Sequence, residues 1–388
     1  MSDAKDAFEK NMELEKLKAE TAAKKVVLDS KRINSQMEAL EQSERDMELT
    51  KNANFGALSE TDIAKIQKDN DDYMEAAKMA MTFIIPEFNN IVPFFRKNFI
   101  LIGARTGEGK STAVANITFT TLANGKRALV ITNEEKSEDF YNRITSLSRG
   151  WHYTNHNKFT DQQKEVFRNM IPILARGGRL TVIDNNHGGS HSVTTSIEGI
   201  AAIFENLMKN KIYYDVIIID YYQNIIHSLK YPNLSENDVQ ARLSRMMDKY
   251  KNEYPAPIVM MAQINAPDKD DKIPFQHRIK GRKIIMDPST FAVEMIRNTD
   301  ELYTKWVVHK SRFTESIGKD MKTGYDRGRF VKYDTAFAEK VQKMKYDKDA
   351  RKINDQIDKG NGLPDVFNAK ADSEKKEDPT GNSGGDNE

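Results

Sequence analysis

One stretch of the chain has the residue types and spacing of a phosphate-binding loop. It follows the apolar run Phe99–Gly103, and its residues are Ala104, Arg105, Thr106, Gly107, Glu108, Gly109, Lys110, Ser111 and Thr112. The glycines let backbone N–H groups turn toward phosphate oxygens, and the amino terminus of a following helix favours negative charge. Lys110 is expected to reach the β- and γ-phosphates, and Ser111 to coordinate a magnesium ion. The loop therefore predicts two cofactors, ATP and Mg²⁺.

Two acids can complete such a site. An apolar strand ends at Asp220, where a carboxylate can hold the magnesium ion or its water. Tyr221 follows rather than an acid, so the general base must lie elsewhere. Glu134 follows the apolar run Ala128–Thr132, and the carboxyl ends of neighbouring parallel strands converge, so we expect Glu134 to orient the attacking water. Its neighbour Glu135 is the alternative. One of the two is expected to be a solvated surface acid, which leaves Glu134 as the base.

Four short motifs carry a family resemblance. In chain order they are ARTGEGKST, TNEEKSEDFYNR, IIIDYYQNI and MMAQIN, and together they resemble the ordered motifs of DnaB-like replicative helicases. A fifth segment, VVHKSRFTESIG, is similar to the lysine–arginine strand in the helicase half of bacteriophage primase-helicases. The resemblance covers residues 83–334 and neither flank. It implies a RecA-like motor that hydrolyses ATP at the subunit interfaces of a ring, expected to be a homo-hexamer, and translocates on single-stranded DNA in phage-type replication.

The same resemblance implies roles for four further residues. Gln263 matches the sensor of the γ-phosphate. Lys310 and Arg312 match a pair that acts on the nucleotide of the neighbouring subunit, with Arg312 as the arginine finger that stabilises charge on the transferring phosphoryl group. Arg143 matches an arginine near the nucleotide. A satisfied core amide at Gln263 and surface cations at Lys310 and Arg312 are the alternative interpretations.

The polar segment between Gln263 and Phe291 resembles the central-channel loops of ring helicases. In such loops lysines and arginines follow the phosphates of single-stranded DNA without reading bases. The cations expected to do so are Lys269, Lys272, Arg278, Lys280, Arg282 and Lys283. Three aspartates dilute the first half of the segment, so a merely solvated loop is the alternative. The half from Arg278 to Lys283 is the better candidate for DNA binding.

A sheet must position these residues. Short apolar runs alternate with helix-like segments, a pattern typical of parallel strands with crossover helices. The expected strands are Phe99–Gly103, Ala128–Thr132, Leu180–Asp184, Val216–Asp220, Ile258–Ala262, Phe291–Ile296 and Tyr303–His309. The segment Ser111–Asn124 is expected to be the helix after the phosphate loop. The fold class predicted is therefore α/β, a RecA-like P-loop core with a mainly parallel central sheet.

Composition divides the chain into five parts. Residues 1–54 are dense in charge and predict a helical arm, which is either a solvated helix, a weak coiled coil or a partner-binding element. Residues 55–82 predict a connector helix that Ser59 and Asp62 open, with Ile63 and Ile66 on its apolar face. Residues 83–337 are the expected motor domain, residues 338–359 a charged helical segment, and residues 360–388 a disordered acidic tail.

Bulk properties restrict the class of protein. The 388 residues carry a formal net charge of +1, which gives no global electrostatic argument for nucleic acid. There is no cysteine, so disulfides, zinc–thiolate sites and thiol catalysis are excluded. No apolar run has the form of a secretion signal or the length of a membrane span. We therefore expect a cytoplasmic protein, in the host cytoplasm if phage-encoded, without a membrane partner. Its expected partners are single-stranded DNA and copies of itself. A primase or polymerase is the candidate partner of the flanking segments, with a purely solubilising tail as the alternative.

Two other functions are compatible with the same residues. A RecA- or RadA-like recombinase, or a related loader ATPase, shares the core and the position of the glutamate. A nucleotide-switched DNA-binding assembly module would use the loop without appreciable turnover. A small-molecule kinase is disfavoured, because nothing resembling a phosphoacceptor pocket accompanies the loop.

Overall fold

The structure is a computed structural model. It describes residues 59–78, 80–151, 159–185, 193–231, 233–266, 273–281, 283–312 and 315–358, with five single positions between residues 37 and 48. Apart from those five positions, the expected arm at residues 1–54 and the expected tail at residues 360–388 lie outside the described residues. The chain divides into two compact units, residues 1–71 and residues 72–388.

Among the described residues of the second unit, nine strands form one sheet in the order β3-β2-β4-β5-β1-β6-β7-β8-β9. Their bounds are β1 Phe99–Ala104, β2 Ala128–Thr132, β3 Leu180–Ile183, β4 Val216–Asp220, β5 Ile258–Gln263, β6 Phe291–Asn298, β7 Tyr303–Ser311, β8 Asp320–Asp326 and β9 Arg329–Lys332. All pairings among β1 to β6 are parallel. The expected α/β fold with a mainly parallel sheet is therefore confirmed.

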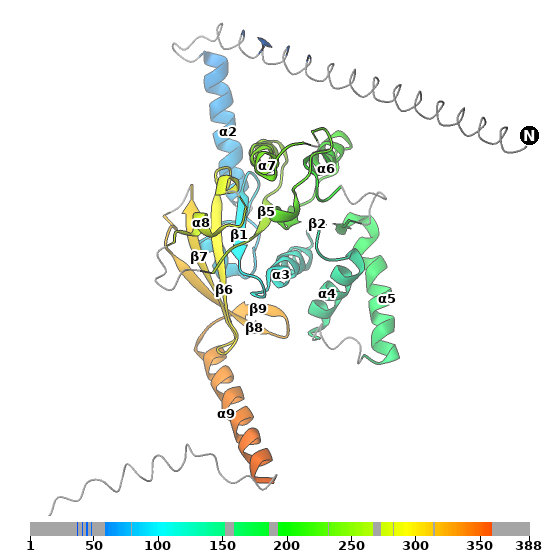
Figure 1. The fold of residues 1–388 in the computed structure, drawn as a ribbon, viewed down its shortest axis with the longest axis vertical. Coiled ribbons are helices and arrows are strands. Elements are labelled where there is room, and N and C mark those ends of the chain that lie inside the picture. Colours follow the sequence, from blue (N-terminus) through cyan, green and yellow to red (C-terminus); the bar gives the residue numbers. More distant parts are fainter. Residues whose placement is uncertain are drawn as a thin grey trace, which may run out of the picture. The chain divides into compact units, whose positions relative to one another are not determined.

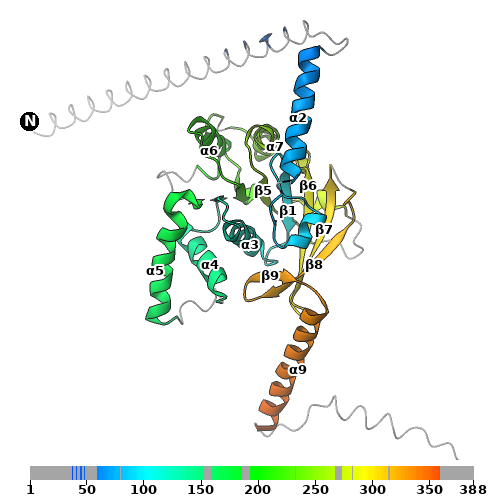
Figure 2. The same ribbon diagram turned by 180° about the vertical axis from the view of Figure 1, so that it is seen from behind.

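Helices cover both faces of this sheet (Figures 1 and 2). Successive side chains of a strand point to opposite faces, so each buried strand supplies two cores. Ile100, Ile102, Val130 and Ile218 pack with α3 (Lys110–Ala123) and α4 (Ser137–Arg149). Leu101, Leu129, Ile217 and Met260 pack with α6 (Ile197–Lys209) and α7 (Glu236–Glu253). The outer helix α5 (Asp161–Ala175) packs on α4.

The carboxyl-terminal part of the sheet is antiparallel. β7 was expected among the parallel strands, but it pairs antiparallel with β6, since residues 299–302 are too short to form a crossover. β8 and β9 were not expected, because β8 is mostly polar, β9 has only four residues, and neither has the Val and Ile runs of the buried strands. Asn116 of α3 holds their hairpin, with Nδ2 donating to the Gly328 carbonyl at 2.8 Å and Oδ1 accepting from the Phe330 N–H at 2.9 Å.

Two helices flank the sheet in sequence. The connector appears as α2 (Glu60–Lys78), which crosses the boundary between the two units. Ser59 opens it, since its hydroxyl accepts from the Asp62 N–H at 3.2 Å. Ile63 and Ile66 on its first half are exposed. After β9 comes α9 (Thr335–Asp358), which begins slightly before the expected charged segment. In the described part of the chain, no helix combines the length and apolarity that crossing a membrane requires.

Candidate functional site

The phosphate loop occupies the turn between β1 and α3. Gly107 and Gly109 have φ angles of 83° and 96°, a region that residues with a side chain rarely adopt. Gly109 directly precedes α3, and its carbonyl accepts from the Ala113 N–H at 2.9 Å. The first N–H groups of a helix have no partner within the helix. The loop therefore offers backbone donors and a helix amino terminus to an anion.

Two side chains of the loop bind each other. Arg105 Nε donates to Glu108 Oε1 at 2.6 Å, and the Arg105 N–H donates to Glu108 Oε2 at 3.1 Å. Glu108 is buried, so the pair braces the loop. Lys110, Ser111 and Thr112 follow in the first turn of α3 and are half-buried. Their position at the helix terminus is the one that the sequence predicted.

Asp220 ends β4 and pairs with Thr132 of β2. It is 2% exposed, and its Oδ1 has no hydrogen-bond partner among the described residues. Burial raises the pKa of Asp220 to about 7; the charge of Glu134 adds to this effect and that of Lys110 opposes it. A buried carboxylate oxygen without a partner is costly unless a cation neutralises it. The environment of Asp220 therefore fits a hard divalent cation such as Mg²⁺.

Asn133 joins the ends of β2 and β4. Its N–H donates to the Asp220 carbonyl at 2.9 Å. Its side chain donates to the Tyr221 carbonyl at 3.0 Å and accepts from the Tyr221 N–H at 3.1 Å. The peptide bond between Asp220 and Tyr221 is cis. Lys110 Nζ lies 5.7 Å from the centroid of the Tyr221 ring. Asn133 thus fixes the backbone next to Glu134 beside the backbone of Asp220.

The two glutamates after β2 differ in environment. Both N–H groups donate to the Thr132 hydroxyl, at 3.3 Å from Glu134 and 3.1 Å from Glu135. The side chain of Glu135 is only 12% exposed and pairs with Arg143 at 2.7 Å between Oε1 and Nη2. Glu135 Oε2 is buried without a hydrogen-bond partner among the described residues. Glu134 is exposed. The solvated acid of the pair is therefore Glu134, whereas the sequence argument left that position to Glu135.

Gln263 ends β5 and pairs with Ala104 at the start of the phosphate loop. Its Nε2 donates to the hydroxyl of Thr106 in that loop. Gln223, in the turn Tyr222–Asn224 after β4, holds the backbone of Gln263. Gln223 Oε1 accepts from the Gln263 N–H at 2.9 Å, and Gln223 Nε2 donates to the Gln263 carbonyl at 2.9 Å. The amide of Gln263 is thus held against the phosphate loop.

Arg297 also lies at the phosphate loop, near the end of β6. A Cβ added to Gly109 would lie 3.6 Å from Arg297 Nη1, so the guanidinium lies close to the loop. Arg297 also lies 4.5 Å from the centroid of the Tyr325 ring on β8. A guanidinium and an aromatic ring at this position form a planar, cationic surface beside the loop.

Lys310 and Arg312 lie at the opposite end of the strands from the phosphate loop. β7 runs antiparallel to β6, so Ser311 pairs with Phe291, the first residue of β6. The Arg312 N–H donates to the carbonyl of Thr290 at 3.0 Å, before β6 begins. The phosphate loop instead follows the last residue of β1. The sheet therefore separates this pair from the phosphate loop of its own chain.

Three cations bind consecutive carbonyls of the turn at residues 286–288. Lys310 Nζ donates to the carbonyls of residues 286 and 287, the latter at 2.8 Å, and Arg312 Nη2 also donates to residue 287. Lys251 Nζ donates to the carbonyl of residue 288 at 2.9 Å. Burial, with the charge of Arg312, lowers the pKa of Lys310 to about 8. Lys251 and Arg312 line a pocket of about 290 Å³ at this turn.

The expected DNA-binding cations have different positions. Lys269, Lys272 and Arg282 lie outside the described residues, and Lys280 and Lys283 are exposed. The expectation for Arg278 is wrong. It is 5% exposed, and its two terminal nitrogens donate to Glu294 at 2.6 and 2.5 Å. This guanidinium is bound inside the protein and is not available to a DNA phosphate.

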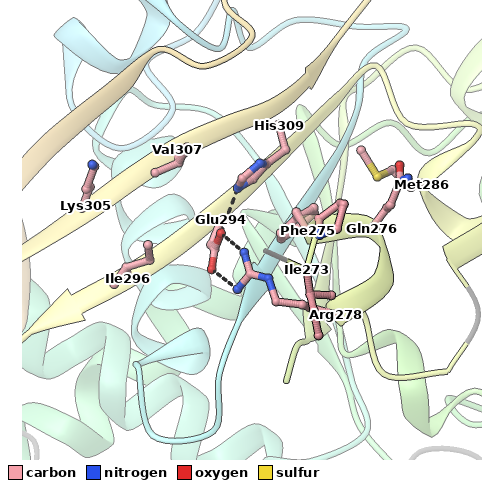
Figure 3. A pocket seen from close by; sticks show the side chains of 11 residues that line it. Ile273, Phe275, Gln276, Arg278, Met286, Glu294, Ile296, Lys305, Val307 and His309 are labelled. Atoms are coloured by element: carbon pink, nitrogen blue, oxygen red, sulfur yellow. Dashed lines mark hydrogen bonds and ion pairs between the residues drawn. The ribbon is translucent and has the colours of Figure 1, made fainter. Parts of the chain in front are cut away.

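Glu294 is the centre of a buried polar cluster (Figure 3). His309 Nε2 lies 2.8 Å from its Oε2, and the ring of Phe275 stacks on that of His309 with centroids 4.5 Å apart. Burial by itself raises the pKa of Glu294, but the hydrogen bonds from His309 and Arg278 outweigh it and hold the pKa at about 2. These residues line a pocket of about 510 Å³ over β6 and β7.

Sequence reasoning missed Asn133, Gln223, Arg297 and Glu294. Asn133 and Gln223 had a detectable signal, because each lies within three residues of a strand end that already carried a predicted site residue. Polar side chains just beyond the carboxyl ends of parallel strands gather at one edge. Glu294 gave no such signal, since its partners Arg278 and His309 are distant in sequence.

Comparison with known proteins gives one family and a set of folds. The family model of the DnaB-like helicase C-terminal domain matches residues 85–305, more than half of the chain. Among solved structures, an ATPase domain aligns with 14% identity and a TM-score of 0.58, over 71% of this chain and 100% of that one. A DnaB-like replicative helicase, solved in a study of its interactions with primase, aligns with 14% identity and a TM-score of 0.57. That alignment covers 76% of this chain and 72% of the helicase. No curated protein sequence matches.

Proposed function

Because the chain belongs to the DnaB-like helicase C-terminal domain family, we propose that its subunits form a ring that moves along single-stranded DNA. Family membership makes the chain an ATP-hydrolysing helicase. The proposal adds that each ATP is hydrolysed between two neighbouring subunits, in a ring expected to be a hexamer. The observation that carries it is the separation of Lys110 from Arg312, which lie at opposite ends of the strands of one sheet. This separation supports a site that a neighbouring subunit completes.

The nucleotide half of the site is supplied by the phosphate loop. Backbone N–H groups of Thr106, Gly107 and Gly109 and the start of α3 would bind the phosphates, and Lys110 would neutralise the terminal ones. Ser111 and Asp220 would hold Mg²⁺, which the unpartnered Asp220 Oδ1 supports. When bound, the ion supplies charge stabilisation at the phosphoryl oxygens. Arg297 lies close enough to the loop to contact the nucleotide as well.

Hydrolysis requires a base and a sensor. Glu134 would orient the attacking water, and the effect of its charge on Asp220 supports this because it places the carboxylate near the proposed magnesium ligand. Glu135 would instead hold Arg143 in place near the nucleotide. Gln263 would sense the γ-phosphate, since its amide already contacts Thr106 of the phosphate loop.

The neighbouring subunit would supply Lys310 and Arg312. Arg312 would act as the finger that stabilises negative charge on the transferring phosphoryl group, and Lys310 would contribute a second positive charge. Both side chains donate to carbonyl oxygens, which hold them without neutralising them as a carboxylate would. This pair is therefore ready to accept an anion from outside the chain.

DNA would bind at the loop after β5. Lys280 and Lys283 are exposed and would contact phosphates, together with Lys269, Lys272 and Arg282. Phosphate contacts of this kind carry no base specificity, which suits an enzyme that must traverse any sequence.

The flanks would serve assembly. We propose residues 83–337 as the motor domain and residues 55–82 as a connector that packs on the adjacent subunit, which the exposed Ile63 and Ile66 support. The arm at residues 1–54, the charged helix at 338–359 and the tail at 360–388 would contact replication partners such as a primase or polymerase. We assign the chain to phage-type DNA replication in the cytoplasm of the host.

The proposal is tested by unwinding forked DNA substrates of both polarities, with and without ATP, alongside a mass measurement of the assembly. ATP-dependent unwinding by a ring-sized assembly is expected. Strand exchange without fork unwinding would instead indicate a recombinase or loader. Negligible turnover with Mg²⁺ and DNA would indicate a nucleotide-switched binding module.

A further inference from the structure

The chain that leaves β5 comes back to pair with the end of that strand, and the paired residues form a short two-stranded stem. Ile264 and Ile279 form an antiparallel bridge. The Asn265 N–H donates to the Arg278 carbonyl at 2.7 Å, and the Lys280 N–H donates to the Gln263 carbonyl at 2.9 Å. Residues 263–265 and 278–280 together form this stem. The stem joins the proposed sensor to the proposed DNA-binding residue Lys280.

One face of the stem is fixed to β1 and to the antiparallel strands. The buried Arg278 binds Glu294 of β6, and Glu294 binds His309 of β7 (Figure 3). Phe275, three residues before Arg278, lies directly over β1: a Cβ added to Gly103 would lie 2.6 Å from its ring. This face is thus closely packed and held by buried charge, so it is the fixed side about which the rest of the stem moves.

On the opposite side, the attachment seen among the described residues is one side chain, that of Gln223. Gln223 Nε2 donates both to the Gln263 carbonyl at 2.9 Å and to the Lys280 carbonyl at 2.8 Å. Gln223 Oε1 accepts from the Gln263 N–H at 2.9 Å. One amide therefore holds both strands of the stem. Gln223 lies three residues after Asp220, so the same side chain also connects the stem to the end of β4.

We propose that Gln223 is a positioning residue that couples the phosphate sensor Gln263 to the DNA-binding return strand of the stem at Lys280. This inference rests on the proposed function. Displacement of Gln263 relative to the phosphate loop changes the position of its backbone. The Lys280 N–H binds the Gln263 carbonyl directly, so the two strands shift together, and the amide of Gln223 sets their position relative to the end of β4. Without Gln223, nucleotide and DNA still bind, but the joined strands lose this attachment to the end of β4, so the effect of each site on the other weakens.

The test replaces Gln223 in the full-length protein and measures coupling separately from binding. Gln223→Met keeps the length of the side chain and removes all three hydrogen bonds. Gln223→Glu keeps the acceptor for the Gln263 N–H but cannot donate to the Lys280 carbonyl. Gln276→Met is the matched control, because Gln276 is exposed on the same segment. Steady-state ATP turnover is measured with and without single-stranded DNA. The Kd of a fluorescent ATP analogue, the Kd of labelled single-stranded DNA and Tm are measured alongside.

The ratio of DNA-stimulated to basal turnover is expected to fall about fivefold or more in Gln223→Met, in the range of ordinary coupling between sites. Gln223→Glu is expected to lose stimulation as well, and Gln276→Met to retain it. Both Kd values should change by less than about threefold, which is small compared with ordinary coupling between sites. Unchanged stimulation in both Gln223 variants overturns the inference. A fall in Tm with loss of both affinities also overturns it, since it makes Gln223 merely structural. If the unsubstituted protein shows no DNA stimulation, the proposed function fails first, and the inference fails with it.

Discussion

Arg312 and Lys110 lie at opposite ends of the strands of one sheet. The Arg312 N–H donates to the carbonyl of Thr290, and Thr290 in turn donates its N–H to the carbonyl of Phe99, the first residue of β1. Lys110 lies beyond the last residue of the same strand. Five steps along β1 at about 3.3 Å each separate the two levels by about 17 Å. Arg312 also binds the carbonyl of residue 287 on its own side of the sheet. A role for both residues in one hydrolysis event therefore requires two chains.

A mixing experiment tests this requirement. Lys110→Ala and Arg312→Ala are each expected to lower ATP turnover by about 10³-fold or more, because each removes charge stabilisation of the transferring phosphoryl group. When the two variants are mixed and allowed to exchange subunits, turnover should return in part. The phosphate loop of an Arg312→Ala subunit then meets the intact finger of a Lys110→Ala subunit. Coupled-assay turnover is measured as a function of the mixing ratio.

The control for mixing is Arg168→Ala, which removes an exposed arginine of α5 and should retain full turnover. Native mass measurement confirms that subunits of the two variants share assemblies. Shared assemblies with no recovery at any ratio would contradict action across the interface, and would mean that both residues are needed within one chain.

Asp220→Asn is expected to raise the stability of the metal-free protein and to abolish its metal binding. The Asp220 pKa of about 7 in the folded state lies above the ordinary value of 3.8. Between these values the folded state binds more protons than the unfolded state, so stability without metal falls as pH rises from about 4 to about 7. Asp220→Asn removes this penalty. In EDTA, its Tm should exceed that of the unsubstituted protein at about pH 8 and equal it near pH 4. Its affinity for Mg²⁺ with nucleotide should be lost.

Thermal unfolding across this pH range, with and without Mg²⁺ and nucleotide, checks the prediction. Asp320→Asn, which makes the same change at an exposed carboxylate outside the nucleotide site, serves as the control. If Asp220→Asn instead lowers Tm in EDTA at about pH 8, the carboxylate has a stabilising partner and its burial is not the cause of the raised pKa.

The contrast between Asp220 and Arg278 illustrates what the sequence can predict. The phosphate loop, Asp220 and Gln263 were predictable because each lies at the end of a buried strand, where position follows from the parallel pattern alone. Arg278 was not predictable. Its charge suggested DNA binding, but its partner Glu294 is 16 residues away and its environment depends on the packing of β6 against the stem. A cation on a polar segment has the same local pattern whether it faces solvent or a buried acid.

The same limit applies to the antiparallel strands. β8 and β9 alternate polar and apolar residues too weakly to be recognised, and they are held by Asn116 of α3, more than 200 residues away in sequence. Local periodicity contains no information on such a contact. Conversely, the buried runs of β1, β2 and β4 were recognised within one residue of their ends, because strands buried on both faces are nearly continuous in Val, Ile and Leu.

The two glutamates after β2 predict distinct kinetic effects. Glu134→Gln should reduce ATP turnover by about 10²-fold or more while ATP still binds, since a neutral amide cannot accept a proton from water. Glu135→Gln removes the charge that holds Arg143, and should weaken nucleotide binding more than it slows the chemical step. Single-turnover kinetics and nucleotide Kd values separate the two effects. The reverse assignment, with Glu135→Gln blocking chemistry at unchanged affinity, would make Glu135 the base.

Glu294 predicts a loss of stability that depends on pH. Its folded pKa of about 2 lies below the ordinary value of 4.5, so its stabilising contribution is fully present above about pH 4.5 and is lost as pH falls toward 2. Glu294→Gln leaves the buried Arg278 without a counter-charge, and breaking a buried pair costs about 3–5 kcal/mol.

The matched control is Asp320→Asn, which breaks the half-exposed pair between Lys305 and Asp320 and should cost at most about 1 kcal/mol. Chemical denaturation at about pH 7 should therefore show a large loss for Glu294→Gln and a small one for Asp320→Asn, and the loss for Glu294→Gln should shrink at about pH 3. Equal losses in the two variants at neutral pH would contradict a structural role for Arg278 and return it to the residues available for DNA.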